Sequence, residues 1–145
     1  MKELLYLKDD QLKEFIEKLF IAYRESFSDS KKILDKYSIG MAHHKVMYFL
    51  SIYKGITISG LLKKLKVTKQ SLNRVLKDLN KLKTVSFQKD EIDTRIKHVF
   101  LNEKGEKIFD EIFITQKKRI YKALLNSTSE EVLFFDKVIK KIING

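Results

Sequence analysis

The strongest structural signal in the chain is the stretch of residues 57–82, TISGLLKKLKVTKQSLNRVLKDLNKL. Apolar residues recur at helical spacing over residues 58–65, and a second apolar stripe of the same kind follows over residues 72–82. Thr57 and Thr68 each stand just before one stripe, where a hydroxyl can accept hydrogen bonds from the first free amides of a helix. Two short helices joined by so short a turn are typical of a helix-turn-helix.

The second of these helices has a polar face opposite its apolar stripe. In the major groove of double-stranded DNA, Gln and Asn can bond adenine, while Arg and Lys can bond guanine or phosphate. An ordinary solvated helix face would carry similar residues. The segments on either side are therefore needed to distinguish a DNA-binding face from a solvated one. We predict that this helix binds DNA through Thr68, Lys69, Gln70, Ser71, Asn73, Arg74, Lys77 and Lys81.

The periodicity changes after this helix. Residues 85–89 and 96–101 are rich in β-branched and aromatic side chains and flank the polar stretch 90–95, as the strands of a β-hairpin do. Asp93 lies two residues from Arg95, so it can orient the guanidinium or tie down the hairpin. We predict a β-wing with Asp93 as its internal brace and with three DNA-contacting side chains, Lys89, Arg95 and Lys97.

The basic charge of the chain is concentrated in this same region. The 145 residues include 30 Lys plus Arg and 19 Asp plus Glu, for a formal net charge of +11. Residues 54–104 alone carry 13 basic and 5 acidic side chains, a net charge of +8. A uniformly lysine-rich chain would spread its charge evenly, so the segregation favours a nucleic-acid partner for this segment.

The segments on either side are apolar and more nearly neutral. Residues 9–37 read as one long amphipathic helix, and a shorter helix follows that stops at Gly55. Asn102 can cap a long helix that ends near Leu125, with Gly105 as a mild weakness in its first turn, and the last helix lies beyond a break at residues 126–129. A wide apolar face at a chain end needs a partner.

The composition excludes several classes of protein. The chain contains no Cys, so it has no disulfide framework, no thiolate zinc site, no iron–sulfur cluster and no thiol redox sensor. It has no run of about 18 apolar residues and no signal-peptide pattern at its start. We therefore expect a folded, cytoplasmic, single-domain protein that does not associate with membranes.

An enzyme is the first alternative. The carboxylates Asp90, Glu91 and Asp93, near Lys97 and His98, could hold Mg²⁺ in a nuclease. A hairpin tip with carboxylates next to basic residues is more often a solvated turn, and no glycine-rich phosphate loop is present. We therefore predict that the chain is not an enzyme and uses no metal or cofactor.

A zinc site and a non-specific DNA-binding protein are two further alternatives. Adjacent His43 and His44 cannot face the same way on a helix, so they do not indicate a zinc site; we expect one to cap or pack and the other to be exposed. A non-specific architectural DNA-binding protein would share the basic segment, but it would not need Gln70 and Asn73 on the groove-facing side.

Residues 93–105 resemble the wing-to-helix signature of MarR-type transcription regulators, DxRxxxxxLTxxG, with Asn102 in place of the Thr. The run LLKKLKVTKQSLNRVL, residues 61–76, is similar to the helix-turn-helix of that family, and the resemblance extends over residues 39–112, including features of its PetP-type subgroup. Three positions depart from the family pattern: Lys66 and Lys83 stand where Gly is usual, and Phe87 stands where Arg is usual.

The resemblance implies a mainly helical fold with a small β-wing. Residues 39–104 would form the DNA-binding region, and residues 1–38 and 105–145 would form the helices of a homodimer. Each subunit would place one helix in the major groove and Arg95 at the adjacent minor groove of a pseudo-palindromic operator, with half-sites about 10 bp apart. A small aromatic effector is also implied, bound by residues that could instead simply pack the core: Tyr23, Phe27, His44, Tyr48 and Tyr53.

Overall fold

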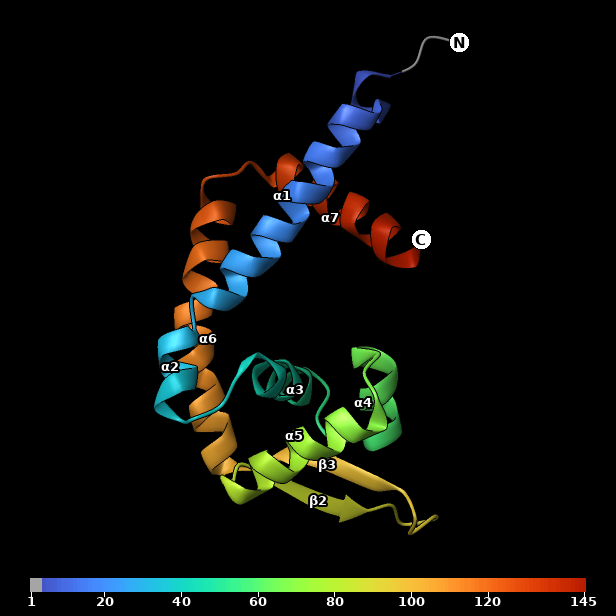
Figure 1. Cartoon of the computed structure of the whole chain (residues 1–145), viewed down its shortest axis with the longest axis vertical. Helices are drawn as coiled ribbons and strands as arrows, with labels where there is room; N and C mark the ends of the chain where they lie inside the picture. The colour runs from blue at the N-terminus through green and yellow to red at the C-terminus, as the bar shows by residue number, and fades with distance from the viewer. Residues whose placement is uncertain (1–3) are drawn as a thin grey trace. The chain divides into compact units, whose positions relative to one another are not determined.

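The computed structural model describes residues 4–145, which form two compact units. Residues 30–113 form the winged-helix unit, and residues 4–29 with 114–145 form the terminal-helix unit. Helix α6 (Glu103–Leu125) contributes residues to both (Figure 1). The described residues are mainly helical with one small antiparallel sheet, which confirms the predicted fold class.

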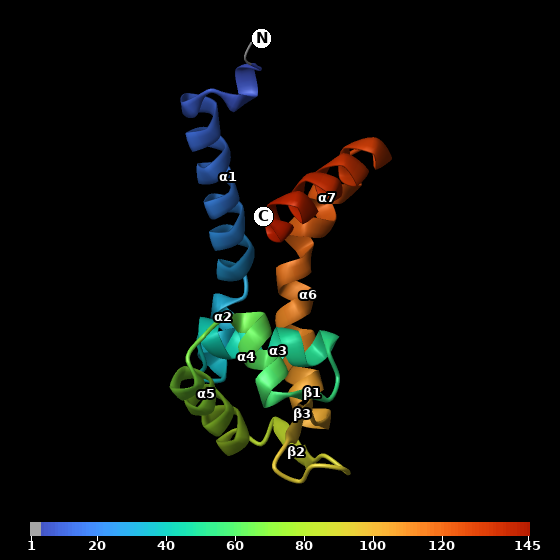
Figure 2. The ribbon, with the colours of Figure 1, turned by 90° about the vertical axis from the view of Figure 1, so that its right-hand side faces the viewer.

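The winged-helix unit contains the predicted helix-turn-helix and wing (Figure 1). Its elements before α6 are α2 (Lys31–Lys36), α3 (Met41–Ile52), β1 (Ile56–Thr57), α4 (Ile58–Leu65), α5 (Lys69–Lys81), β2 (Val85–Lys89) and β3 (Lys97–Leu101). The strands pair in the order β1-β3-β2, and the turn joining β2 to β3 projects from the unit in both views (Figure 2). Strand β1 was not predicted, and β3 begins one residue later than expected.

The turn between α4 and α5 is fixed by local backbone chemistry. The Thr57 hydroxyl accepts a hydrogen bond from the Gly60 amide at 3.0 Å, and the Thr68 hydroxyl accepts one from the Ser71 amide at 3.1 Å. Lys66 adopts the left-handed conformation with φ of 52°, which ends α4 within a single residue. Both predicted N-caps are therefore confirmed, and Lys66 takes a conformation that favours the Gly usual at this position.

The core of the winged-helix unit holds α5 in place. Leu72, Leu76 and Leu79 of α5 are buried, and so is Val99 at the centre of the sheet. Other buried side chains come from α3, α4 and the first half of α6, among them Met47, Leu50, Leu61, Ile108 and Ile112. Because the apolar stripe of α5 lies in this core, its polar face is directed to solvent.

The junction between α5, β2 and α6 is closely packed. Asn102 donates from Nδ2 to the Lys83 carbonyl at 2.9 Å and accepts the Gly105 amide at Oδ1, also at 2.9 Å, so its predicted capping role is confirmed. A Cβ on Gly105 would overlap the carbonyl oxygen of Thr84, which is fully buried. The view of Gly105 as a mild weakness is therefore wrong, because only glycine allows this approach of the two backbones.

The terminal-helix unit contains a 3₁₀ turn (Leu5–Leu7), α1 (Asp9–Ser28), the second half of α6 and α7 (Ser129–Asn144). The prediction of one helix over residues 9–37 is wrong, because α1 ends at Ser28 and α2 is separate. The hydroxyls of Ser26 and Ser28 bond to carbonyls of the preceding turn, and such side-chain bonds compete with continued helix. The Asp29 carboxylate, which follows, binds the Arg119 guanidinium through two hydrogen bonds of 2.6 and 2.9 Å.

The helices of the terminal-helix unit leave many of their apolar side chains exposed. Neither α1 nor α7 contains a single buried residue, although both helices lie wholly within the described part of the chain. Helix α7 nevertheless begins at a well-formed cap, in which Thr128 and Glu131 bond each other's backbone amides. The local signals for these helices are strong, and what the single chain lacks is a surface to pack them against.

Candidate nucleic-acid interface

All the side chains that were predicted on the polar face of α5 are exposed to solvent. Thr68, at the N-cap, and Lys69, Gln70, Ser71, Asn73, Arg74, Lys77 and Lys81 are exposed. The hydroxyls of Thr68 and Ser71 also bond each other at 2.9 Å. These two residues therefore build the start of the helix, whereas the longer side chains that follow extend from its exposed face.

A histidine joins this helix to α3. His43 Nδ1 accepts the Gly40 amide at 3.0 Å, and His43 Nε2 lies 2.9 Å from Asp78 Oδ2 on α5. The hydrogen bond from His43 lowers the pKa of Asp78, assisted by the nearby positive charges on α5. The expected capping role is therefore confirmed for His43, but the expectation that the other histidine is exposed is wrong, because His44 is fully buried. The contact between His43 and Asp78 therefore joins α5 to α3.

The wing is a regular hairpin with a carboxylate-stabilised turn. Strands β2 and β3 pair from Val85↔Leu101 to Lys89↔Lys97, so both lysines lie at the turn end. The Asp90 carboxylate accepts the amides of Ile92 and Asp93 at 3.1 and 3.0 Å. These bonds make the turn compact and lower the pKa of Asp90.

Arg95 is presented to solvent by Asp93. Asp93 Oδ1 accepts the backbone amide and Nε of Arg95 at 3.1 and 3.0 Å, and Oδ2 accepts an Nη at 3.1 Å. The Arg95 side chain is 89% exposed, and this contact lowers the pKa of Asp93. The pairing expected between the two residues is present, and it holds one edge of the guanidinium while the other edge faces outward.

A second histidine ties the wing to β1. His98 Nδ1 lies 2.7 Å from the Gly55 carbonyl oxygen, and His98 Nε2 lies 2.8 Å from Asp90 Oδ1. Hydrogen bonding to Asp90, and then to the Gly55 carbonyl, raises the pKa of His98. Sequence reasoning considered His98 only as part of a metal cluster and so missed this contact.

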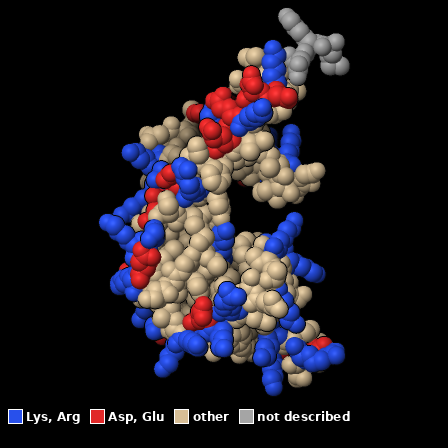
Figure 3. Space-filling model, viewed as in Figure 1, with Lys and Arg blue, Asp and Glu red and all other residues tan. Residues whose placement is uncertain are grey.

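The wing lies beside α5. A hollow of about 250 Å³ separates them and is lined by Ile58, Asn73, Leu76, Lys77, Asn80, Phe87 and Lys97. Lys89 and Lys97 are both exposed at the turn end of the hairpin, and Figure 3 shows more Lys and Arg than acidic side chains around the unit. Phe87 forms part of the apolar floor of this hollow, at a position where the family resemblance implies Arg.

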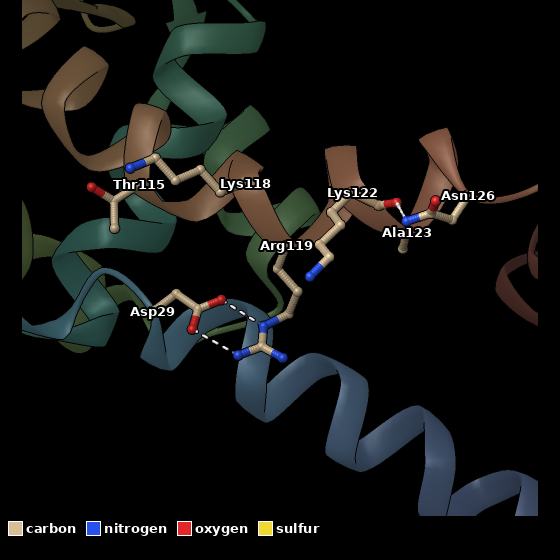
Figure 4. A pocket seen from close by; sticks show the side chains of 7 residues that line it. All are labelled: Asp29, Thr115, Lys118, Arg119, Lys122, Ala123 and Asn126. Carbon is tan, nitrogen blue, oxygen red and sulfur yellow. Dashed lines mark hydrogen bonds and ion pairs between the residues drawn. The ribbon is translucent and has the colours of Figure 1, made fainter.

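The five residues predicted to bind an effector are divided between the units. Tyr23 and Phe27 of α1 contact each other with ring centroids 5.0 Å apart. In the winged-helix unit, His44 and Tyr48 form part of an aromatic cluster, and Tyr53 stacks on the neighbouring Phe49. The terminal-helix unit has its own hollow of about 640 Å³, lined by other residues: Asp29, Thr115, Lys118, Arg119, Lys122, Ala123 and Asn126 (Figure 4).

Two of the three carboxylates considered for a metal site, Asp90 and Asp93, are engaged in the wing turn. Asp90 bonds two amides and His98, and Asp93 bonds Arg95. Over residues 4–145, no three His, Asp or Glu side chains are arranged to hold a metal ion. Within the same range, no helix combines the length and apolar character that crossing a membrane requires.

The sequence is similar to that of a known transcriptional regulator. It is 36% identical over 141 residues to the HTH-type transcriptional regulator PetP of Rhodobacter capsulatus, an alignment that covers 97% of this chain and 85% of that protein. The chain belongs to the MarR family of transcriptional regulators. No family model matches the sequence. Its relatives are DNA-binding regulators and not enzymes, so the nuclease alternative is not supported.

Solved MarR-family structures share the fold at low sequence identity. A MarR family regulator from Silicibacter pomeroyi is 17% identical, with a TM-score of 0.76 and coverage of 98% of this chain and 94% of that one. NadR in complex with 4-hydroxyphenylacetate is 18% identical, with a TM-score of 0.77 and coverage of 98% and 97%. A mutant MarR from E. coli complexed with operator DNA is 21% identical, with a TM-score of 0.69 and coverage of 97% and 99%.

Proposed function

We propose that this MarR-family regulator binds a pseudo-palindromic operator as a homodimer, with α5 in the major groove and the wing at the adjacent minor groove. The observation that carries the proposal is the exposed polar face of α5, whose opposite face is anchored in the core. An anchored helix of this kind is what reading base edges requires. Because a regulator of this type acts on chromosomal DNA, we propose that it works in the cytoplasm.

The wing supplies the second part of the interface. Lys89 and Lys97 are suited to phosphate contacts, and Arg95 is held outward by Asp93 at the edge of the hairpin turn. Arginine is favoured in narrow, A·T-rich minor grooves because the electrostatic potential there is strongly negative. We therefore assign Arg95 to the minor groove that flanks the major-groove site of α5.

The uncovered apolar side chains of the terminal-helix unit support dimerisation. They include Phe15, Ile16 and Phe20 on α1, and Phe134, Phe135, Val138, Ile142 and Ile143 on α7. An isolated chain would leave all of them in water, at a cost of roughly 25 cal/mol for each Å² of apolar surface. A second copy of the chain covers such faces through a two-fold axis, and that symmetry matches a pseudo-palindrome.

A small aromatic effector completes the proposal. The structural relative NadR is described in complex with 4-hydroxyphenylacetate, and this chain has aromatic side chains in both units that would suit a similar ligand. Such a ligand would change operator affinity only by binding two dimer conformations with different affinities. Titration of the operator complex with 4-hydroxyphenylacetate tests this part, and unchanged operator affinity at saturating ligand would argue against that effector.

Replacing Arg74 with Ala is expected to lower operator affinity about tenfold or more, because a base-contacting Arg contributes about 1–3 kcal/mol. Arg74 is exposed, so the melting temperature should hardly change. The measurement is the ratio of affinities for operator and random DNA at fixed salt concentration. If the parent bound operator and random DNA equally well, a non-specific architectural protein would be favoured. If the variant kept the parent's ratio of operator to random-DNA affinity, Arg74 would not be a base contact.

Replacing Lys81 with Ala is expected to weaken binding to all DNA sequences by a similar factor. Lys81 is an exposed point charge near the end of α5, which suits a phosphate contact better than a base contact. Losing one phosphate contact should reduce the slope of log affinity against log salt concentration by about one. Filter-binding titrations over a salt series measure the slope, and equal slopes for parent and variant would contradict the assignment.

A further inference from the structure

Both ring nitrogens of His98 face hydrogen-bond acceptors. Nδ1 lies 2.7 Å from the Gly55 carbonyl oxygen and Nε2 lies 2.8 Å from Asp90 Oδ1. A carbonyl and a carboxylate can only accept hydrogen bonds, so both contacts are hydrogen bonds together only when the ring is an imidazolium. His43 differs, because its Nδ1 accepts a hydrogen bond from the Gly40 amide.

The imidazolium is the first link in a chain of hydrogen bonds that ends at the wing tip. Asp90, bonded to His98, also accepts the amides of Ile92 and Asp93. Asp93 in turn accepts the backbone amide and the guanidinium of Arg95. His98 therefore connects the loop before β1, at Gly55, to the turn that presents Arg95. Among these hydrogen bonds, the one to Gly55 is the bond that reaches a residue outside the hairpin.

We propose that protonated His98 is a positioning residue for Arg95, and that operator affinity therefore falls as the pH rises and His98 loses its charge. The proposal rests on the assignment of Arg95 to the minor groove. A neutral imidazole can donate from only one nitrogen, so it has to release either Gly55 or Asp90. In both cases the wing turn loses one of the hydrogen bonds that hold it, and the Arg95 guanidinium becomes less ordered.

The direction of the pH dependence follows from the groups that face His98. Asp90 is the charged one, and the residues paired with His98 on β1 and β2, Thr57 and Gln88, are uncharged. Asp90 and the Gly55 carbonyl raise the pKa of His98 above its ordinary 6.5. The contact is therefore intact below pH 6.5 and is lost as the pH rises through the higher folded-state value, while Asp90 stays ionised throughout.

The first test is operator affinity between about pH 6 and about pH 9, the range that covers histidine titration. We expect the parent to lose affinity roughly threefold to tenfold across this range, as for coupling between neighbouring groups. His98→Gln should bind weakly at every pH and show no such decline. Asp90→Asn keeps the turn-forming side-chain oxygen but removes the charge, so it should shift the midpoint of the decline to lower pH.

Coupling to Arg95 separates positioning from general stability. In an Arg95→Ala background, His98→Gln should cause no further loss of affinity, because the residue through which it acts is absent. His43→Gln is the matched control, since it removes the other His–Asp contact of the winged-helix unit and should leave the pH-dependent decline in place. Additive losses from His98→Gln and Arg95→Ala would overturn the positioning role.

The charge on His98 can also be tested in the absence of DNA. Titration of the ring by NMR should give a pKa above 6.5 that falls in Asp90→Asn, with both ring N–H signals visible at low pH. A neutral ring at pH 6.5 would overturn the proposal, and so would pH-independent affinity in a parent that still prefers operator to random DNA. Loss of that preference at every pH would instead overturn the proposed function, while the NMR titration still decides the charge on His98.

Discussion

The double variant Val138→Glu, Ile142→Glu is expected to be monomeric at concentrations where the parent is a dimer. The two residues lie one turn apart on α7 and are 44% and 47% exposed in the single chain. Substitution therefore removes little buried area from the protomer itself. In the proposed dimer, each new carboxylate would be desolvated against an apolar partner at a cost of about 2 kcal/mol or more.

The two-fold dimer contains four such carboxylates, and a total cost of about 8 kcal/mol raises the dimer dissociation constant about a millionfold. Sedimentation equilibrium measures the constant directly, and circular dichroism reports whether the helices persist. Lys140→Ala is the matched control, because it removes only an exposed ion pair with Asp136 one turn away on the same helix. A double variant that still forms dimers at the parent's concentration would show that this stripe of α7 is not in the interface.

Loss of the dimer should also remove most of the operator affinity. A monomer holds one recognition helix and one wing, so the second half-site no longer binds as an intramolecular step, and the loss is expected to reach roughly a hundredfold or more. Binding to a single half-site should be unchanged, since α5 and the wing lie in the other unit. This difference between full and half operators distinguishes a lost interface from a damaged DNA-binding surface.

The parts of the fold that sequence could predict depend on neighbours along the chain. The hydroxyls of Thr57 and Thr68 each accept a hydrogen bond from the amide three residues ahead, so a hydroxyl just before an apolar stripe was sufficient evidence for a cap. The contact between Asp93 and Arg95 spans two residues and could be expected from spacing alone. The exposed face of α5 followed in the same way from helical periodicity.

Most features that escaped prediction depend on contacts distant in sequence. Strand β1 has two residues and exists only because Ile56 and Thr57 pair with Val99 and His98. The His98 contact with Gly55 spans 43 residues, so no local pattern marks it. The break after Ser28 was missed because apolar periodicity continues past it, although the serines nearby were a usable signal.

The substitution Gly105→Ala is expected to destabilise the winged-helix unit by about 3 kcal/mol. In an exposed helix the same change stabilises by about 1 kcal/mol, so the two expectations differ in sign. What decides the sign is the Thr84 carbonyl, which an alanine Cβ would overlap. Backbone cannot move aside as a flexible side chain can, and Thr84 is fixed by two hydrogen bonds to the Leu79 carbonyl, from its amide and its hydroxyl.

The other glycines of the unit give a graded set of controls for thermal unfolding. At Gly60 an added Cβ would meet mainly the Ile56 side chain, which can shift, so Gly60→Ala should cost less. At Gly40 the nearest atom is 3.9 Å away, so Gly40→Ala should be close to neutral. If all three variants had similar melting temperatures, the close approach of α6 to the Thr84 backbone would not be a constraint in solution.

The functional consequence of Gly105→Ala should follow from where the strain falls. Asn102 holds both Gly105 and the Lys83 carbonyl, and Lys83 lies between α5 and β2 in the left-handed conformation with φ of 60°. A displaced α6 therefore moves the segment that sets the wing relative to the recognition helix. We expect operator affinity to fall even at temperatures where the variant remains folded, whereas dimerisation, which we propose to depend on the terminal-helix unit, should be retained.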